Sequence, residues 1–403
     1  MVPKGWKRVP IKYACESIID CVNKTAPVVD YKTPFKMIRT TNVRNGRVNT
    51  EDVRYVTEET YLQWVRRGRP QVGDIIFTRE APVGEVGILE DAHGIFLGQR
   101  TMMYRASNHR ADNYFLFYAL SSQFCQKQIE DLSSGGTVAH MRVPDCSEIL
   151  INLPPRQEQN KIAQILSTWD RAISTTEQLL ANSQQQKKAL MQQLLTGKKR
   201  LLDKNGVRFS GKWKTYKFGS LFNERVETGR DDLPLLSITA DDGVVYQEDT
   251  GRKNTSNEDK SKYRRICVND IGYNTMRMWQ GRSSLSDKEG IVSPAYTIVT
   301  PTGKVCPAYA AYLFKFPALV HIFYRHSQGL VSDTWNLKFN HFKKISWQVP
   351  SIDEQQKIAA VLSTADKEVT AQQQKLDALK QEKKALMQQL LTGKRRVKVE
   401  AAA

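Results

Sequence analysis

The sequence predicts an α+β protein made of two tandem halves, in which each half is an α/β domain followed by a long helix. The two helices are expected to pack as an antiparallel coiled coil around a pseudo-two-fold axis. Three observations predict this fold class: a repeated twelve-residue string, a heptad pattern that leads into each copy, and a recurring order of strands and helices between the copies.

The internal repeat is the strongest of these observations. The string "KKALMQQLLTGK" occurs at 187–198 and, letter for letter, at 383–394. At the same offset of 196 residues, 154–200 aligns without a gap to 350–396, and 26 of the 47 positions are identical. The helical segments have stayed alike while the rest diverged, which indicates that the helices share one task and the domains perform different ones.

Each repeated segment is predicted to be one long helix. Apolar side chains recur every three or four residues, in the same register in both copies. Among the residues of this seam are Ile162, Leu166, Trp169, Leu190 and Leu194 in the first copy and Ile358, Leu362, Leu376, Leu386 and Leu390 in the second. Ser351 and Glu354 have the spacing of a capping box, and Gly197 and Gly393 stand where a helix C-cap favours positive φ. A helix of about 40 residues spans roughly 60 Å, so we interpret the pair as a ruler, with the repeated ends as two equivalent docking sites for a partner.

The two domains show the same order of elements. Strand patterns lie at 35–43, 74–80, 85–91 and 100–106 before a helical stretch at 112–132, and at 233–240, 270–279 and 293–301 before a helical stretch at 307–326. The offset of 196 pairs Asp74 with Asp270 at the start of one strand in each half. Polar loops follow at 133–143 and 327–339, so each domain is predicted to be a strand-rich α+β fold.

The composition favours a polyanionic partner. The 403-residue chain has a formal net charge of +18 and a pI of about 9.5, and such a basic protein usually meets nucleic acid; a solvated surface with surplus lysine is the alternative. The six cysteines lack CxxC or zinc-knuckle spacing, and no apolar run reaches the ~20 residues that span a bilayer. The first residues contain no apolar signal segment, so we expect a cytoplasmic protein with reduced thiols.

Groups of polar side chains in each domain have the composition that reads nucleic acid. Arginine matches guanine, asparagine and glutamine match adenine, and small polar or cationic groups hold phosphate. The candidates are Arg39, Thr40, Asn42, Arg44, Thr78, Arg79, Thr137, His140 and Arg142 in the first domain, and Tyr273, Asn274, Arg277, Trp279, Gln280, Arg282, Trp335, Asn336 and Lys338 in the second. Any one of them alone also fits an unpartnered surface position, but together, on so basic a protein, they favour DNA contact.

The common enzyme motifs are missing. There is no P-loop, no HExxH, no GxSxG and no GxGxxG after a strand. The string "NLPPRQ" resembles the Asn-Pro-Pro-aromatic loop of amino-methyltransferases only in part, because Leu153 separates Asn152 from the prolines and Arg156 replaces the aromatic residue. The six histidines are scattered, so we expect neither a metal site nor a catalytic one.

The repeated motif carries a specific resemblance. The string "PPRQEQNKIAQIL", which closes on "KKALMQQLLTGKKR", and its second copy resemble the specificity subunits of type I restriction-modification systems. The "SGGT" loop at 134–137 fits the same family, and the resemblance covers the whole chain. The first copy departs from the pattern at Arg156, in a slot where the second copy keeps the apolar Ile352.

The resemblance implies a non-catalytic DNA reader. Two target recognition domains would each read one half of a split, asymmetric site in double-stranded DNA, and the helices would set the unread spacer. Two modification (methyltransferase) subunits and the restriction (motor-nuclease) subunits would be the partners, and S-adenosylmethionine, ATP and Mg would belong to them. The segments would be recognition domain 1 (1–153), helix 1 (154–197), a linker (198–212), recognition domain 2 (213–349), helix 2 (350–396) and a tail (397–403).

Three other interpretations stay open. The chain could serve a related phage-defence or type II-like system, act alone as an enzyme, or be a coiled-coil adaptor that binds only proteins. The tandem repeat favours the DNA reader independently of the resemblance, because a pseudo-two-fold protein matches two half-sites at a spacing that its own geometry sets.

Overall fold

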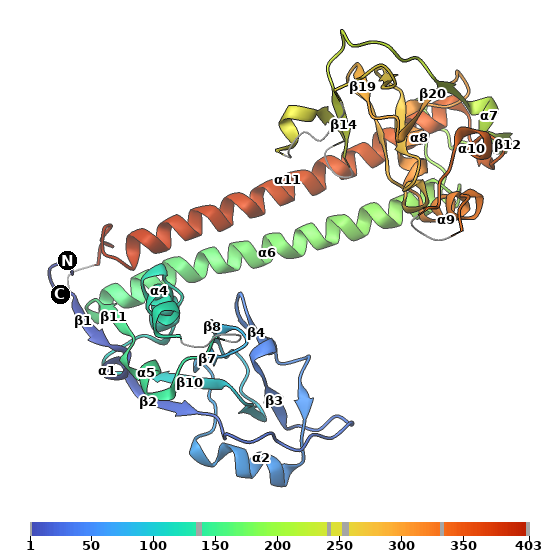
Figure 1. Ribbon diagram of the computed structural model, residues 1–403. Coiled ribbons are helices and arrows are strands. Elements are labelled where there is room, and N and C mark those ends of the chain that lie inside the picture. The colour runs from blue at the N-terminus through green and yellow to red at the C-terminus, as the bar shows by residue number, and fades with distance from the viewer. Residues whose placement is uncertain (1, 134–138, 240–242, 252–257, 331–333, 400–403) are drawn as a thin grey trace. The chain divides into compact units, whose positions relative to one another are not determined.

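The computed structural model describes residues 2–133, 139–239, 243–251, 258–330 and 334–399 (Figure 1). The chain forms two compact units, one of residues 1–177 and 374–403 and the other of residues 178–373. Each unit therefore combines one α/β domain, the first part of the helix that follows this domain, and the last part of the other long helix.

The first unit is built on a six-stranded sheet. The strands of the whole unit are β1 (Lys7–Pro10), β2 (Cys15–Asp20), β3 (Lys36–Ile38), β4 (Val43–Arg44), β5 (Gly46–Val48), β6 (Arg54–Tyr55), β7 (Ile75–Arg79), β8 (Val83–Ile88), β9 (Ile95–Leu97), β10 (Thr101–Ala106) and β11 (Leu150–Leu153). Its short helices are α1 (Ile11–Ala14), η1 (Thr40–Asn42), α2 (Glu58–Trp64), η2 (Val65–Arg67), α3 (Asn113–Leu120), α4 (Gln123–Leu132) and α5 (Val143–Glu148). The main sheet has the order β2-β10-β7-β8-β5-β4, and β6-β3-β9 and β1-β11 form two smaller sheets.

The second unit repeats the centre of this sheet. Its strands are β12 (Lys214–Lys217), β13 (Phe222–Arg225), β14 (Leu236–Ile238), β15 (Val244–Tyr246), β16 (Arg264–Ile266), β17 (Ile271–Asn274), β18 (Ser283–Leu285), β19 (Gly290–Val292), β20 (Tyr296–Pro301) and β21 (Ser346–Val349). Its short helices are α7 (Phe218–Leu221), η3 (Gln247–Thr250), η4 (Met278–Gln280), α8 (Pro307–Phe314), α9 (Pro317–His326) and α10 (Phe339–Phe342). The antiparallel order β13-β20-β17-β18 matches β2-β10-β7-β8 of the first unit, which confirms two tandem α+β domains.

Two long helices of 39 residues each, α6 (Arg156–Leu194) and α11 (Ile352–Leu390), follow the domains (Figure 1). In the first unit Glu158 pairs with Arg396 and Asp170 pairs with Lys383. Residue numbers therefore rise along one helical segment and fall along the other, as predicted for an antiparallel pair. The second unit has the same contacts at the repeat offset.

The helix ends confirm one prediction and correct another. Gly197 and Gly393 end the helical segments with φ of 71° and 69°, the left-handed conformation that glycine adopts without strain. The predicted capping box is wrong, because both carboxylate oxygens of Glu354 accept hydrogen bonds from Arg200, at 2.6 and 2.7 Å. Glu354 therefore pairs with an arginine instead of reaching back to the backbone of Ser351.

Each apolar core includes the end of the helix that began in the other half. Leu390 and Leu391 are buried in the core of the first unit, and Leu194 and Leu195 in that of the second. Because the apolar residues of the two repeated ends face these cores, only their polar sides are open to a partner.

Each predicted helical stretch at 112–132 and 307–326 is in fact two helices. In the first, the Ser122 hydroxyl accepts the N–H of Cys125 at 3.3 Å and starts α4 as a new helix. In the second, Pro317 at the first turn of α9 cannot continue α8.

Candidate nucleic-acid interface

In each unit the turn after one central strand is tied to the polar loop that precedes a short helix. The N–H of Met141 donates to the carbonyl of Arg79 at 2.9 Å, and the N–H of Leu337 donates to the carbonyl of Thr275 at 2.8 Å. Donor and acceptor differ by 196 positions between the units, so this is one hydrogen bond present twice. It brings together the two polar segments that the sequence marked in each domain, and we call each pair the tied loops.

A buried aspartate fixes the strand that carries each turn. Asp74 is 2% exposed and Asp270 is 1% exposed. Asp74 binds the guanidinium of Arg105 at 2.7–2.8 Å, and Asp270 binds that of Arg225 at 2.6 Å. These hydrogen bonds raise the pKa of both arginines. A buried carboxylate that lost its partner would be costly, so the two pairs hold β7 and β17 in place.

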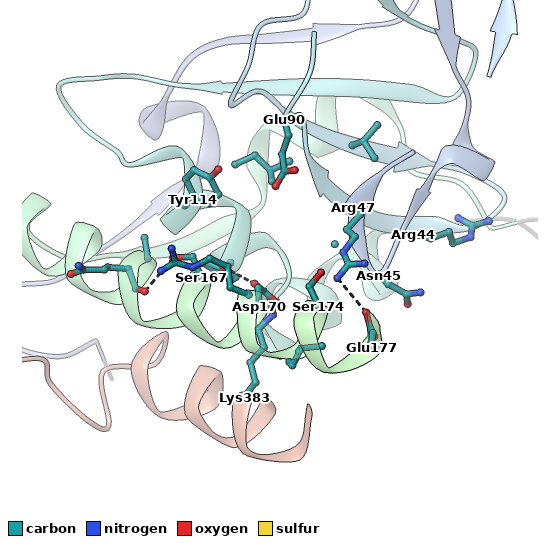
Figure 2. A pocket seen from close by; sticks show the side chains of 18 of the residues that line it. Arg44, Asn45, Arg47, Glu90, Tyr114, Ser167, Asp170, Ser174, Glu177 and Lys383 are labelled. Atoms are coloured by element: carbon teal, nitrogen blue, oxygen red, sulfur yellow. Dashed lines mark hydrogen bonds and ion pairs between the residues drawn. The ribbon is translucent and has the colours of Figure 1, made fainter. Parts of the chain in front are cut away.

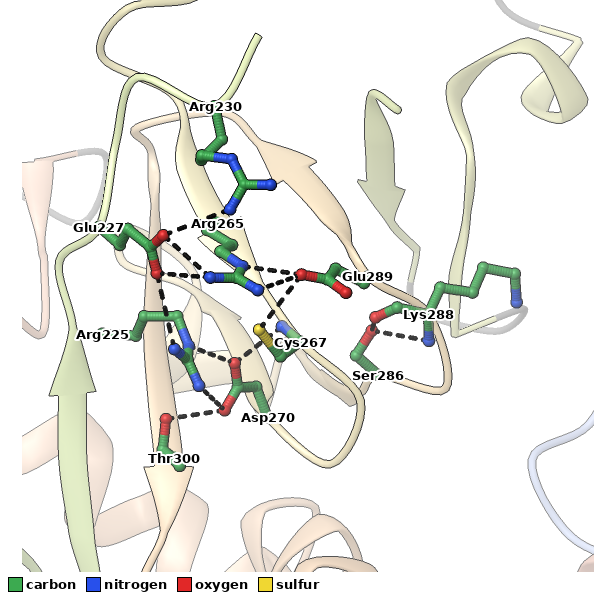
Figure 3. A network of polar contacts seen from close by, with 10 residues as sticks. All are labelled: Arg225, Glu227, Arg230, Arg265, Cys267, Asp270, Ser286, Lys288, Glu289 and Thr300. Carbon is green, nitrogen blue, oxygen red and sulfur yellow. Dashed lines mark hydrogen bonds and ion pairs between the residues drawn. The ribbon is translucent and has the colours of Figure 1, made fainter. Parts of the chain in front are cut away.

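Around Arg225 the second unit has a dense polar network (Figure 3). Arg265 donates to Glu227 at 2.9 Å and also pairs with Glu289, and Arg230 pairs with Asp232 at 2.7 Å. The positive charges of these arginines are neutralised within the domain, so they are poor candidates for phosphate binding.

The second unit carries an apolar patch beside its tied loops, made of Met276, Trp279, Tyr324 and Trp335. The rings of Trp279 and Trp335 meet edge to face with centroids 5.4 Å apart, and Tyr324 lies 4.9 Å from Trp335. The indole N–H of Trp279 donates to the carbonyl of Met276 at 3.0 Å. Met276 is 47% exposed and Tyr324 is 42% exposed, so the patch reaches solvent although its rings pack on one another.

The chain segments that carry the patch residues are rich in positive charge. The stretches 271–286, 315–330 and 334–349 contain no aspartate or glutamate, and η4 packs against α9 among them. Their lysines and arginines are Arg277, Arg282, Lys315, Arg325, Lys338, Lys343 and Lys344. A concentration of cations around apolar and amide-bearing loops is the electrostatic pattern of a nucleic-acid surface.

The equivalent place in the first unit has different chemistry. Glu80 stands 196 positions before Met276, pairs with Arg100 at 2.6 Å and forms a β-bridge with His140. The tied loops of the two units thus have the same backbone hydrogen bond and differ in their side chains.

Comparison with known proteins identifies the family. The type I restriction modification DNA specificity domain matches the chain twice, at residues 21–182 and 210–381. The chain belongs to this family. The MjaX specificity subunit of Methanocaldococcus jannaschii is 23% identical over 427 residues, which cover 98% of this chain and 95% of that protein. The type I restriction enzyme MjaVIII specificity subunit of the same organism is 27% identical over 209 residues, 51% of this chain and only 48% of its relative.

Solved structures have the same fold over nearly the whole chain. The S subunit of a type I restriction-modification system from M. genitalium covers 97% of this chain and 96% of its own, with 16% identity and a TM-score of 0.61. A chain from a study of complex assembly and conformational transition of the type I R-M system covers 97% and 98%, with 16% identity and a TM-score of 0.55. The two family matches and these neighbours confirm the predicted specificity-subunit fold.

Several predicted DNA-contacting residues in the first specificity domain instead support its turns. Asn42 is buried and donates to the backbone of Asp52 at 2.6 Å, and buried Thr78 donates to a backbone oxygen of its own loop at 2.6 Å. Arg79 pairs with Asp20 at 3.1 Å and is largely covered. Because these groups already satisfy backbone or ionic partners, we leave them out of the proposed interface.

The polar loop of the first specificity domain offers fewer candidates than expected. His140 and Arg142 are exposed, as a reading role requires. The guanidinium of Arg142 is held by Asp145 at 2.8 and 3.2 Å. Thr137 lies outside the described residues.

In the second specificity domain most candidates lie at the surface. Tyr273 is fully buried, and burial raises the pKa of its phenol. The side chain of Asn274 accepts the N–H of Met276 at 3.0 Å and closes the turn, so these two residues shape the loop. Arg277, Gln280, Arg282 and Lys338 are exposed, and Trp279, Trp335 and Asn336 are partly buried.

A cleft of about 1140 Å³ lies in the first unit between the β4–β5 hairpin and α6 (Figure 2). The predicted residue Arg44 lines it, and its Nη1 donates to the carbonyl of Thr40 at 3.0 Å; Arg39 and Thr40 are half-buried in the same turn. The cleft is lined by equal numbers of acids and bases: Glu90, Asp91, Asp112, Asp170 and Glu177, and Arg44, Arg47, Arg171, Lys380 and Lys383. This balanced charge gives phosphate no preference for the cleft.

The predicted seam residues lie inside the units. Ile162, Leu166 and Leu390 are buried in the first unit, and Leu194, Ile358 and Leu362 in the second. Leu376 is buried, and Trp169, Leu190 and Leu386 are partly buried. The seam therefore holds each domain to both helical segments.

Sequence reasoning missed two polar groups that join each domain to its helices. Asp170 accepts hydrogen bonds from the Tyr118 hydroxyl at 2.6 Å and the Lys383 ammonium at 2.5 Å. In the second unit, Asp366 likewise accepts a hydrogen bond from the Tyr312 hydroxyl and pairs with the Lys187 ammonium. Burial, with the carboxylate hydrogen bond, raises the pKa of both tyrosines. The signal was available, because the aspartates and lysines recur at the repeat offset, where a pure apolar seam has no use for them.

Within the described residues, no cluster of histidine, cysteine, aspartate and glutamate could hold a metal ion. None of the described helices is long and apolar enough to cross a membrane. All six cysteines are free thiols.

Proposed function

We propose that this chain is the DNA sequence-specificity subunit of a type I restriction-modification complex. Each domain reads one half of a bipartite, asymmetric site in double-stranded DNA. The observation that carries the proposal is the pair of tied loops, which repeat one backbone hydrogen bond and present different side chains. A backbone arrangement that occurs in both domains but carries different side chains suits a DNA site whose two halves differ.

The long helices set the distance between the half-sites. Each helix follows one domain in the sequence and ends in the apolar core of the other domain. Both helices therefore contribute residues to both units. Their equal length of 39 residues supports the role of a ruler.

Two modification (methyltransferase) subunits and the restriction (motor-nuclease) subunits are the protein partners. The exposed polar sides of the two repeated helix ends, identical in sequence, give two like subunits the same contact. The chain itself is non-catalytic and works in the cytoplasm, and S-adenosylmethionine, ATP and Mg act in the partners. A related phage-defence or type II-like system could use the same subunit, since the reader's chemistry would not differ.

The test is DNA binding by the chain in complex with its methyltransferase subunits, selected from a random duplex library and measured at several salt concentrations. We expect one split motif to be enriched and the logarithm of the binding constant to fall linearly with that of the salt concentration. Binding that selects no sequence and does not respond to salt would contradict the proposal and favour the protein-only adaptor.

A further inference from the structure

We infer that the second specificity domain recognises thymine in its half-site by contact between its apolar patch and the thymine 5-methyl group. The inference rests on the proposed function and adds the chemical group that this domain reads.

The first argument is the chemistry that the patch leaves available. The indole N–H of Trp279 is already used inside the loop, where it donates to the carbonyl of Met276. The thioether of Met276 and the ring of Tyr324 remain exposed. The patch therefore offers the ligand mainly apolar contact, and a partner gains most by burying an apolar group there.

The second argument is the charge around the patch. The three stretches that carry the patch residues contain cations and no described acid, and Arg277, Arg282 and Lys338 on these stretches are exposed. These exposed cations favour a polyanion over an apolar protein face or a membrane interior. An apolar patch on segments with exposed cations matches a duplex whose phosphates lie on either side of an apolar group in the groove.

The third argument is the chemistry of DNA itself. The thymine methyl is the apolar group that base pairs present in the major groove, and it distinguishes A·T from T·A and from both G·C orientations. The minor groove offers no such group.

The first domain supplies the contrast. At the position equivalent to Met276 it has Glu80, a carboxylate paired with Arg100. A carboxylate accepts hydrogen bonds and does not gain from contact with a methyl group. Methyl reading is therefore a property of the second half-site and contributes to the asymmetry of the site.

The experiment replaces thymine by deoxyuridine, one position at a time, in a duplex that contains the full site, and measures binding by the complex with its methyltransferase subunits. Uracil keeps every hydrogen bond of thymine and removes only the methyl group. At one or more positions of the second half-site we expect about fourfold weaker binding, the equivalent of one buried methyl group. No such loss is expected in the first half-site.

Met276→Ala should abolish the difference between thymine and uracil. Val268→Ala is the matched control and should retain the difference. Val268 is an exposed apolar residue that precedes β17 by three positions, whereas Met276 follows this strand. The inference is overturned if no thymine of the second half-site responds, if that half-site contains none, or if Met276→Ala still discriminates. An apolar wedge in the minor groove would bind both bases alike, which also overturns it. Failure of the proposed function is distinct, since the unmodified duplex would then show no sequence-specific binding.

Discussion

Leu194 and Leu390 allow a sharp prediction, because each should stabilise the domain of the opposite half. Leu194 closes the helix that follows the first domain, yet it is fully buried in the core of the second unit. Leu390 closes the chain's last helix and is 2% exposed in the core of the first unit. Truncation of a buried leucine to alanine costs about 2–5 kcal/mol of the free energy of unfolding, through lost apolar burial and the cavity left behind.

The assay is native-state hydrogen exchange of backbone amides in the central strands. For Leu194→Ala, a cost of about 2–5 kcal/mol speeds exchange that requires unfolding of the second unit by roughly thirtyfold to several thousandfold. We expect this in β17 and β20, with little change in β7 and β10. Leu390→Ala should give the opposite pattern.

Leu179→Ala is the matched control, because Leu179 lies on the same helix as Leu194 and is exposed. It should change exchange in neither sheet. If Leu194→Ala accelerated exchange mainly in the first unit, or in neither unit, the crossing of the helix ends between the domains would be refuted.

Two further predictions concern charge and protonation. Arg277→Gln in the second specificity domain should weaken binding to all DNA sequences alike and reduce the slope of log binding constant against log salt concentration by about 1. Arg230→Gln is the control and should leave the slope unchanged, because the charge of Arg230 is already paired with Asp232. Equal slopes for the two variants would contradict the assignment of Arg277 to phosphate contact. Burial raises the pKa of the Cys125 and Cys146 thiols to about 12, so the unfolded chain loses these protons first as the pH rises. The stability that the two thiols confer should be complete below about pH 9 and be lost towards pH 12, as denaturant titrations across this range would detect; a Cys125→Ala variant with the same alkaline loss would show that another group is responsible.

The repeat and the helices could be predicted from the sequence because identity and periodicity are local properties. The domain in which a helix end packs could not, since Leu194 and Leu390 fit a coiled-coil seam equally well whichever core receives them. Polar residues posed the second difficulty. Asn42 and Thr78 have the composition of a reading surface, but polar groups that close a turn and polar groups that face solvent look alike in a sequence.

Ion-pair partners were also out of reach. The paired aspartates Asp74 and Asp270 were visible at the repeat offset, but their arginines come from strands that are not equivalent, Arg105 from β10 and Arg225 from β13. Only the fold brings each arginine to its carboxylate. The apolar patch was half predicted. Trp279 and Trp335 were among the candidates, and Met276 lies beside the predicted Arg277 in the sequence but was not singled out. Only the fold brings Tyr324 against Trp335.

The most direct test of the central claim is methylation-aware sequencing of DNA from cells that express this chain with its methyltransferase subunits. We expect adenine methylation at a single split motif. The two halves of this motif should differ, because the tied loops of the two domains carry different side chains, and its spacer should have a fixed length, because the long helices set it. A Gln280→Ala variant should alter only one half of that motif. A continuous or palindromic motif, or no methylated motif with methyltransferase subunits shown to be active, would contradict the account.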